Sequence, residues 1–199
     1  AMSRHANEAY GELDQRGKVI CEKMFRTITE KGRNNKGIRH PLSLSAIKSI
    51  VECTTDELLK VIEKFRISSR SFITPGYGIP LNDESIIDIS HESFIGLWDR
   101  LREWVDEEAA SVQMYLQLSE ESAMYQQGKT GLLRPPDLQL AINWRDRQKP
   151  ILAWARRYNP AFERAMVYLR TSEKEYLEEE ERRLRIQRMK MIRTRIMSL

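Results

Sequence analysis

The stretch from Ser85 to Trp104 constrains the fold most, because the spacing of its apolar residues changes within it. Ile87 and Ile89 alternate with polar residues, as in a half-buried strand. The later apolar residues have the spacing of an amphipathic helix: Phe94, Leu97, Trp98, Leu101, Trp104 and Val105. His91 lies where the two patterns meet. We therefore expect a strand that leads directly into a helix, a junction that can present side chains and unpaired backbone N–H groups to a ligand.

The rest of the sequence predicts a mainly helical chain with a few short strands. Up to Ser90, we expect helices at 5–13 and 14–31, an extended segment at 37–41, helices at 43–51 and 54–66, a strand at 70–74, a turn-rich loop at 75–84 and a strand at 85–90. This order is that of a winged helix with its wing at 75–84. The later helices are expected at 106–127, after Pro135, after Pro150 and from Pro160 onward.

These elements predict a fold class that is mainly α: a winged helix with a small β-wing, followed by a helical extension and a long C-terminal helix. We expect four segments, namely a lead-in helix at 1–14, a winged-helix domain at 15–104, a helical extension at 105–170 and a charged linker helix at 171–199. The chain of 199 residues has room for one ordinary domain or two small ones.

The net charge of +4 is concentrated at one end of the chain. Seven Lys or Arg and no acidic residue occur from Arg182 onward, so the residues before them carry a net charge of −3. This end segment, 182–199, fits either a solvated linker helix or a basic segment beside a membrane. No run of about 18 apolar residues occurs, so we expect no membrane-spanning helix here. With only Cys21 and Cys53, which are expected to be reduced, the location indicated is cytoplasmic, with membrane tethering of a longer protein left open.

The winged-helix order raises the possibility of DNA binding, but the charges disfavour it. The helix that would enter the major groove carries Lys60, Lys64 and Arg66. Asp56, Glu57 and Glu63 on the same helix cancel them. A helix without net positive charge has little with which to neutralise DNA phosphates.

No set of residues predicts a catalytic or metal site. Gly128-Lys129-Thr130 resembles part of a phosphate-binding loop, but the first glycine of the motif and the preceding buried strand are missing. The three histidines share no metal-ligand spacing with one another or with the cysteines. The carboxylates are spread over solvated helical faces. We therefore expect a chain that is not an enzyme by itself and that holds no metal or cofactor of its own.

The stretches Ile87 to Ile95 and Leu97 to Trp104 resemble the end of the winged-helix region in bacterial STAND-class (AP-ATPase/NACHT-like) signalling NTPases. That family shows His-Glu-Ser or His-Glu-Ala there, followed by Trp-x-Arg-Leu. The resemblance implies an NTPase domain upstream that binds ADP or ATP, and a repeat or effector domain downstream. It also implies that the winged helix packs on the NTPase in the diphosphate-bound state and moves away on nucleotide exchange.

The same resemblance suggests site residues. His91 occupies the place of the histidine in the Met-His-Asp motif of eukaryotic relatives, which contacts the β-phosphate of the nucleotide. Ser90, Glu92 and Ser93 are its neighbours, with Ser90 and Glu92 in place of Met and Asp; Ser90 is also expected to cap the following helix. Interface candidates are Trp98, Arg100 and Arg102.

The function expected from these residues is coupling of the nucleotide state to downstream domains. The alternatives left open are a DNA-binding transcriptional regulator and a structural adaptor in which His91 contacts no nucleotide.

Overall fold

The computed structural model describes residues 2–197, so residue 1 of the expected lead-in helix and residues 198–199 of the expected linker helix lie outside the described part. The chain divides into two compact units, one up to Ser111 and one from Val112 onward. It is mainly α-helical, with small antiparallel sheets and a long C-terminal helix, which confirms the expected fold class.

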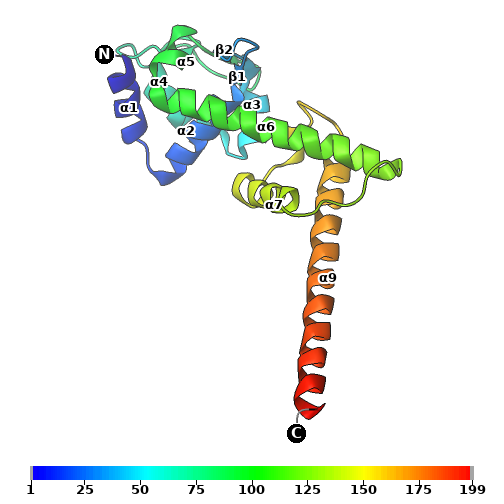
Figure 1. The fold of residues 1–199 in the computed structure, drawn as a ribbon. Helices are drawn as coiled ribbons and strands as arrows, with labels where there is room; N and C mark the ends of the chain where they lie inside the picture. Colours follow the sequence, from blue (N-terminus) through cyan, green and yellow to red (C-terminus); the bar gives the residue numbers. More distant parts are fainter. Residues whose placement is uncertain (1, 198–199) are drawn as a thin grey trace. The chain divides into compact units, whose positions relative to one another are not determined.

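The first unit combines helices with two small sheets (Figure 1). In chain order it contains α1 (Met2–Gly11), α2 (Gln15–Thr27), β1 (Thr29–Lys31), β2 (Gly37–Arg39), β3 (Leu42–Ser43), α3 (Leu44–Val51), α4 (Thr55–Arg66), β4 (Ile73–Thr74), β5 (Ile86–Ile89), α5 (Ser93–Leu97) and the start of α6 (Asp99–Gln126). β1 pairs with β2. The second sheet is antiparallel in the order β3-β5-β4, with β5 in its centre.

Side-chain caps fix the starts of three of these helices. Asp14 accepts a hydrogen bond from a backbone N–H of α2, and Ser43 does the same for α3. At α4, Thr54 and Glu57 form a complete capping box, in which each side chain accepts a hydrogen bond from the other's backbone N–H. Such caps satisfy N–H groups that have no partner inside the helix.

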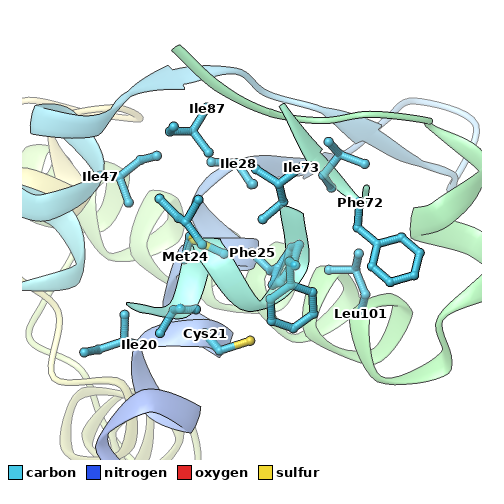
Figure 2. Close-up of a cluster of buried hydrophobic side chains, with 14 of the residues drawn as sticks. Ile20, Cys21, Met24, Phe25, Ile28, Ile47, Phe72, Ile73, Ile87 and Leu101 are labelled. Atoms are coloured by element: carbon cyan, nitrogen blue, oxygen red, sulfur yellow. The ribbon is translucent and has the colours of Figure 1, made fainter. Parts of the chain in front are cut away.

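The core of the first unit forms around one face of α2 (Figure 2). This face carries Ile20, Cys21, Met24 and Phe25, each at most 1 % exposed. Figure 2 shows these side chains beside Ile28, which directly follows α2, and beside apolar side chains from other parts of the unit: Ile47, Phe72, Ile73, Ile87 and Leu101. Ile87 and Ile89 of β5 are both buried, as their alternation with polar residues predicts.

The expected continuous helix through Phe94 and Val105 is interrupted at Trp98. The backbone of Trp98 is extended, with φ −98° and ψ 103°, so α5 ends at Leu97 and α6 begins at Asp99. The break turns the Trp98 indole into the core, where its Nε1 donates to Asn7 Oδ1 at 2.8 Å. α6 then runs without a break through the helix that was expected to begin separately at 106.

Strand β1 was not expected, because the helix that begins at 14 was predicted to continue to about residue 31. α2 ends at Thr27, and the Thr29 hydroxyl donates to the Phe25 carbonyl at 2.6 Å. The next residues pair with β2. The expected strand at 70–74 is likewise reduced to Ile73–Thr74.

The second unit is helical and has its own core. It contains the rest of α6, then α7 (Asp137–Gln148), α8 (Leu152–Ala155) and α9 (Phe162–Met197). Its buried residues include Tyr115, Leu118, Leu138, Trp144 and Leu169. Within this unit, α7 lies beside the N-terminal part of α9, and the residues of α9 after Glu180 are exposed (Figure 1).

Candidate functional site

The candidate site is the junction between β5 and α5, at the end of the central strand of the three-stranded sheet. Its start is fixed by Ser90, whose backbone N–H donates to the Phe72 carbonyl at 3.0 Å. The Ser90 hydroxyl donates to the Ser71 carbonyl at 2.7 Å. Ser90 therefore ties the junction to the segment before β4, and the prediction that its side chain caps the following helix is wrong.

His91 lies between Ser90 and the residue that precedes α5. Its side chain is exposed, and among the described residues its imidazole makes no hydrogen bond or ion pair. Its carbonyl accepts from the backbone N–H of Phe94 at 2.9 Å, which holds the main chain in a turn. Both ring nitrogens are therefore available to another molecule, and a ring nitrogen that carries a proton can donate to a phosphate oxygen.

Glu92 and Ser93 are also exposed, so the polar side chains of the junction point outward. Glu92 is the residue before α5, but its side chain makes no capping hydrogen bond. The backbone N–H of Ile95 donates to the Glu92 carbonyl at 3.1 Å. With the Phe94 N–H also engaged, and with α5 only five residues long, the junction offers fewer free backbone donors and a weaker helix dipole than expected.

Two buried residues of α5 hold the junction in place. The Phe94 ring stacks on Phe72 with ring centroids 4.5 Å apart. Ile95 lies against the backbone of Gly37 in β2, where an added Cβ would come within 2.2 Å of Ile95 Cγ2. Only glycine leaves room for this approach. The exposed polar residues of the junction are thus adjacent in sequence to the tightly packed side chains of Phe94 and Ile95.

The three interface candidates have different surroundings. Trp98 is fully buried in the core, so in this structure its side chain is not available for contact with another domain. Arg100 is exposed, and its guanidinium lies over the Tyr10 ring at 4.2 Å from the centroid, a cation–π contact. Arg102 is exposed and forms an ion pair with Asp99 at 2.9 Å. Arg100 and Arg102 remain surface residues, whereas Trp98 does not.

Arg66 has a structural role that the sequence did not indicate. It lies at the end of α4 and is only 5 % exposed. Its guanidinium donates to three carbonyls of the β4–β5 loop (residues 75–85), those of Pro75, Gly76 and Ile79, at 3.2, 3.1 and 2.9 Å. It also pairs with Glu63 at 2.7 Å. The alternating charges of α4 suggest a solvated residue at this position, and no sequence signal marks Arg66 as buried.

A second unexpected cluster joins the end of α1 to α4. Glu12 accepts from Arg70 at 2.5 Å and pairs with Lys64 at 3.3 Å. The hydrogen bond from Arg70, followed by that from Lys64, lowers the pKa of Glu12 to about 2. Arg16 likewise pairs with Glu57 at 3.2 Å. All of these residues except Arg70 border a shallow groove of about 830 Å³ between the start of α2 and α4, in which cations and carboxylates are mixed.

No group of three or more His, Cys, Asp or Glu residues within 2–197 is arranged to hold a metal ion. The Gly128-Lys129-Thr130 segment follows the end of α6 as a turn, and no buried strand precedes it in the structure. None of the helices described between residues 2 and 197 has the length and apolar character needed to cross a bilayer.

The fold and the site together define a mainly helical chain with a small three-stranded sheet, whose central strand ends in an exposed polar junction. The chain matches the family model for novel STAND NTPase 1 over residues 1–131, which is more than half of its length. It therefore belongs to the novel STAND NTPase 1 family. The match covers the first unit, including the junction at His91, and extends through α6. No curated protein and no solved structure matches the chain.

Proposed function

We propose that this chain is a non-catalytic regulatory region of a STAND-type NTPase. In this proposal residues 15–104 form a winged helix that packs on the nucleotide-binding domain of the same protein. The following helices, 105–170 and 171–199, relay the nucleotide state to downstream domains. The observation that carries the proposal is membership of the novel STAND NTPase 1 family across residues 1–131.

The arrangement of elements in the first unit supports the winged-helix part of the proposal. Apart from the β1–β2 hairpin that follows α2, three helices and three strands occur in the order α2, β3, α3, α4, β4 and β5. The strand order β3-β5-β4 and the loop between β4 and β5 are those of a winged helix with one wing. A module of this kind serves protein contacts as well as DNA contacts, so the fold alone does not assign its partner.

His91 is the residue proposed to sense the nucleotide. Its imidazole is exposed, makes no hydrogen bond or ion pair with the described residues, and belongs to a junction held by Phe94 and Ile95. A small motion of this module toward or away from a bound nucleotide would make or break one hydrogen bond to a phosphate oxygen. Such a differential contact is what a nucleotide needs in order to shift the equilibrium between two packing states.

The test uses the intact protein, which contains the nucleotide-binding domain. His91→Ala is expected to weaken ADP binding about tenfold, the equivalent of one hydrogen bond to a charged group, and to raise basal signalling. Isothermal titration with ADP measures the affinity. His5→Ala is the matched control, because the His5 side chain is partly exposed but pairs with Glu8 on α1. An unchanged ADP affinity in His91→Ala would leave the structural adaptor as the better description.

DNA binding is tested on the same module. The charged face of α4 is engaged, since Lys64 pairs with Glu12 and Glu57 with Arg16. We therefore expect no salt-dependent binding to duplex DNA. Binding that weakens steeply with salt and that is abolished by Lys60→Glu and Lys64→Glu would overturn the proposal in favour of a transcriptional regulator.

A further inference from the structure

The last turns of α9 differ in charge from the turns just before them. Residues 173–181 contain six Glu and one Lys, whereas residues from Arg182 onward contain seven Lys or Arg and no acid. Every described residue from 181 to 197 is exposed. The helix therefore ends in a densely basic segment that no other part of its unit covers, preceded by an acidic one.

This basic segment also carries an exposed apolar stripe. Ile186, Met189, Ile192 and Ile196 are 48 %, 58 %, 58 % and 67 % exposed. At 100° per residue these four side chains fall within an arc of about 120° on the helix.

Basic residues lie on both sides of the arc and within it. On the same helical wheel, Arg188 and Arg195 lie along one edge of the arc and Lys190 along the other, while three further basic residues of the segment fall inside it: Arg182, Arg185 and Arg193. Long basic side chains can extend to polar headgroups while their aliphatic stems and the apolar residues beside them are buried.

We propose that residues 182–197 bind the surface of an anionic lipid bilayer, lying in the headgroup region with the Ile186–Ile196 stripe toward the acyl chains. The seven cations provide the attraction to anionic headgroups, and the stripe provides apolar area to bury. The acidic residues 173–181 are repelled by the same surface. The contact is therefore limited to the last turns of the helix, about 24 Å of its length.

Three alternatives to a lipid surface account less well for the combination of basic charge and apolar stripe. A solvated linker accounts for the charges but leaves four large apolar side chains in water on one face. Nucleic acid would neutralise the cations but would not bury an aliphatic stripe. Parallel pairing of two copies through the stripe would bring like charges together along both edges.

The proposal is tested with the full chain and vesicles of two compositions, phosphatidylcholine alone and phosphatidylcholine with phosphatidylglycerol. Co-sedimentation is expected only with the vesicles that contain phosphatidylglycerol, and it should weaken as salt is added. Replacing three basic residues, Arg188→Gln, Lys190→Gln and Arg195→Gln, should reduce partitioning about a hundredfold. Replacing the stripe with Ile186→Gln, Met189→Gln, Ile192→Gln and Ile196→Gln should reduce it at least about tenfold.

A matched control removes apolar side chains from the opposite face. Leu184 and Met191 are 51 % and 62 % exposed and lie outside the stripe. Leu184→Gln with Met191→Gln is expected to retain most of the binding, and glutamine keeps the helix propensity close to that of the native residues. Circular dichroism of each variant checks that helix content is unchanged.

Three outcomes would overturn the proposal. The first is absence of binding to the anionic vesicles. The second is loss of binding in the charge variant alone, together with tighter binding to duplex DNA or RNA, which would identify a general polyanion site. The third is a dimer in sedimentation equilibrium that the stripe variant dissociates, which would assign the stripe to a second copy of the chain. None of these outcomes bears on the nucleotide contact proposed for His91, so the two proposals fail separately.

Discussion

Charged side chains have opposite surroundings in the first unit and at the end of α9. In the first unit, Arg26 donates to Glu108 at 2.8 Å, and Arg66 donates to three loop carbonyls. Among the described residues after Glu181, only Arg183 has an ion-pair partner, Glu180. The enclosed arginines are thus held by acceptors of their own unit, whereas the exposed basic residues of α9 after Glu181, except Arg183, have no ion-pair partner among the described residues.

The largest expected loss of stability separates a buried residue of the first unit from an exposed one. Trp98→Ala should lower the free energy of unfolding by about 4 kcal/mol, because it removes a fully buried indole and its hydrogen bond to Asn7. Leu97→Ala, one residue away but 54 % exposed, should change it by less than about 0.5 kcal/mol. Urea unfolding measures both. Equal effects would show that Trp98 is not the core residue described here.

The second effect separates an enclosed arginine from an exposed one. Arg66→Ala should destabilise the first unit by about 3 kcal/mol, since the carbonyls of Pro75, Gly76 and Ile79 lose their donor. Arg102→Ala, which removes only a surface ion pair with Asp99, should cost under about 1 kcal/mol. Urea unfolding measures both variants. If both variants lost a similar amount of unfolding free energy, enclosed and exposed arginines would not differ in their contribution to stability.

A smaller effect is expected from the acidic partner of Arg70. The pKa of Glu12 is lowered from 4.5 to about 2, so its ionised form is favoured in the folded state. The contribution of Glu12 to the free energy of unfolding is therefore fully present at a pH above its ordinary pKa of 4.5. This contribution is lost as the pH falls toward about 2. Because Glu12 is partly exposed, we expect under about 1 kcal/mol. The pH dependence of urea unfolding should be shallower in Glu12→Gln over this window, and identical curves would contradict the assignment.

The smallest effect is expected in α9. Arg188→Gln, Lys190→Gln and Arg195→Gln together should change the unfolding free energy of the chain by less than about 0.5 kcal/mol, because these side chains lie outside both cores. Thermal unfolding followed by circular dichroism provides the measurement. A clear loss of stability would mean that the basic segment takes part in folding after all, contrary to the comparison above.

Local patterns in the sequence predicted much of the fold. The helices expected from residues 14 and 54 are present as α2 and α4, and Asp14 and Thr54 cap them. Such helix starts can be predicted because they depend on residues a few positions apart. The alternation of Ile87 and Ile89 predicted β5 for the same reason. The basic segment was also correctly expected to be helical, as far as it is described, up to Met197.

Features that depend on distant partners were missed. The break at Trp98 is accompanied by a hydrogen bond to Asn7, which is 91 positions away in the sequence. β1 requires pairing with β2, and the burial of Arg66 requires the β4–β5 loop to fold back over it. At the site, the sequence predicted the position of the junction. It did not predict that Ser90 bonds to the Ser71 carbonyl, because that contact forms only in the folded sheet.

The way Arg66 holds the β4–β5 loop has a consequence for how freely that loop can vary. The guanidinium recognises backbone carbonyls, which every amino acid supplies, while the side chains of Tyr77 and Ile79 are 61 % and 52 % exposed. The loop conformation is therefore largely insensitive to which residues occupy its outer positions. Members of a lineage could exchange these surface residues, and with them a binding preference, without having to evolve a new backbone. The same property makes positions 77 and 79 suitable sites for a combinatorial library on this scaffold.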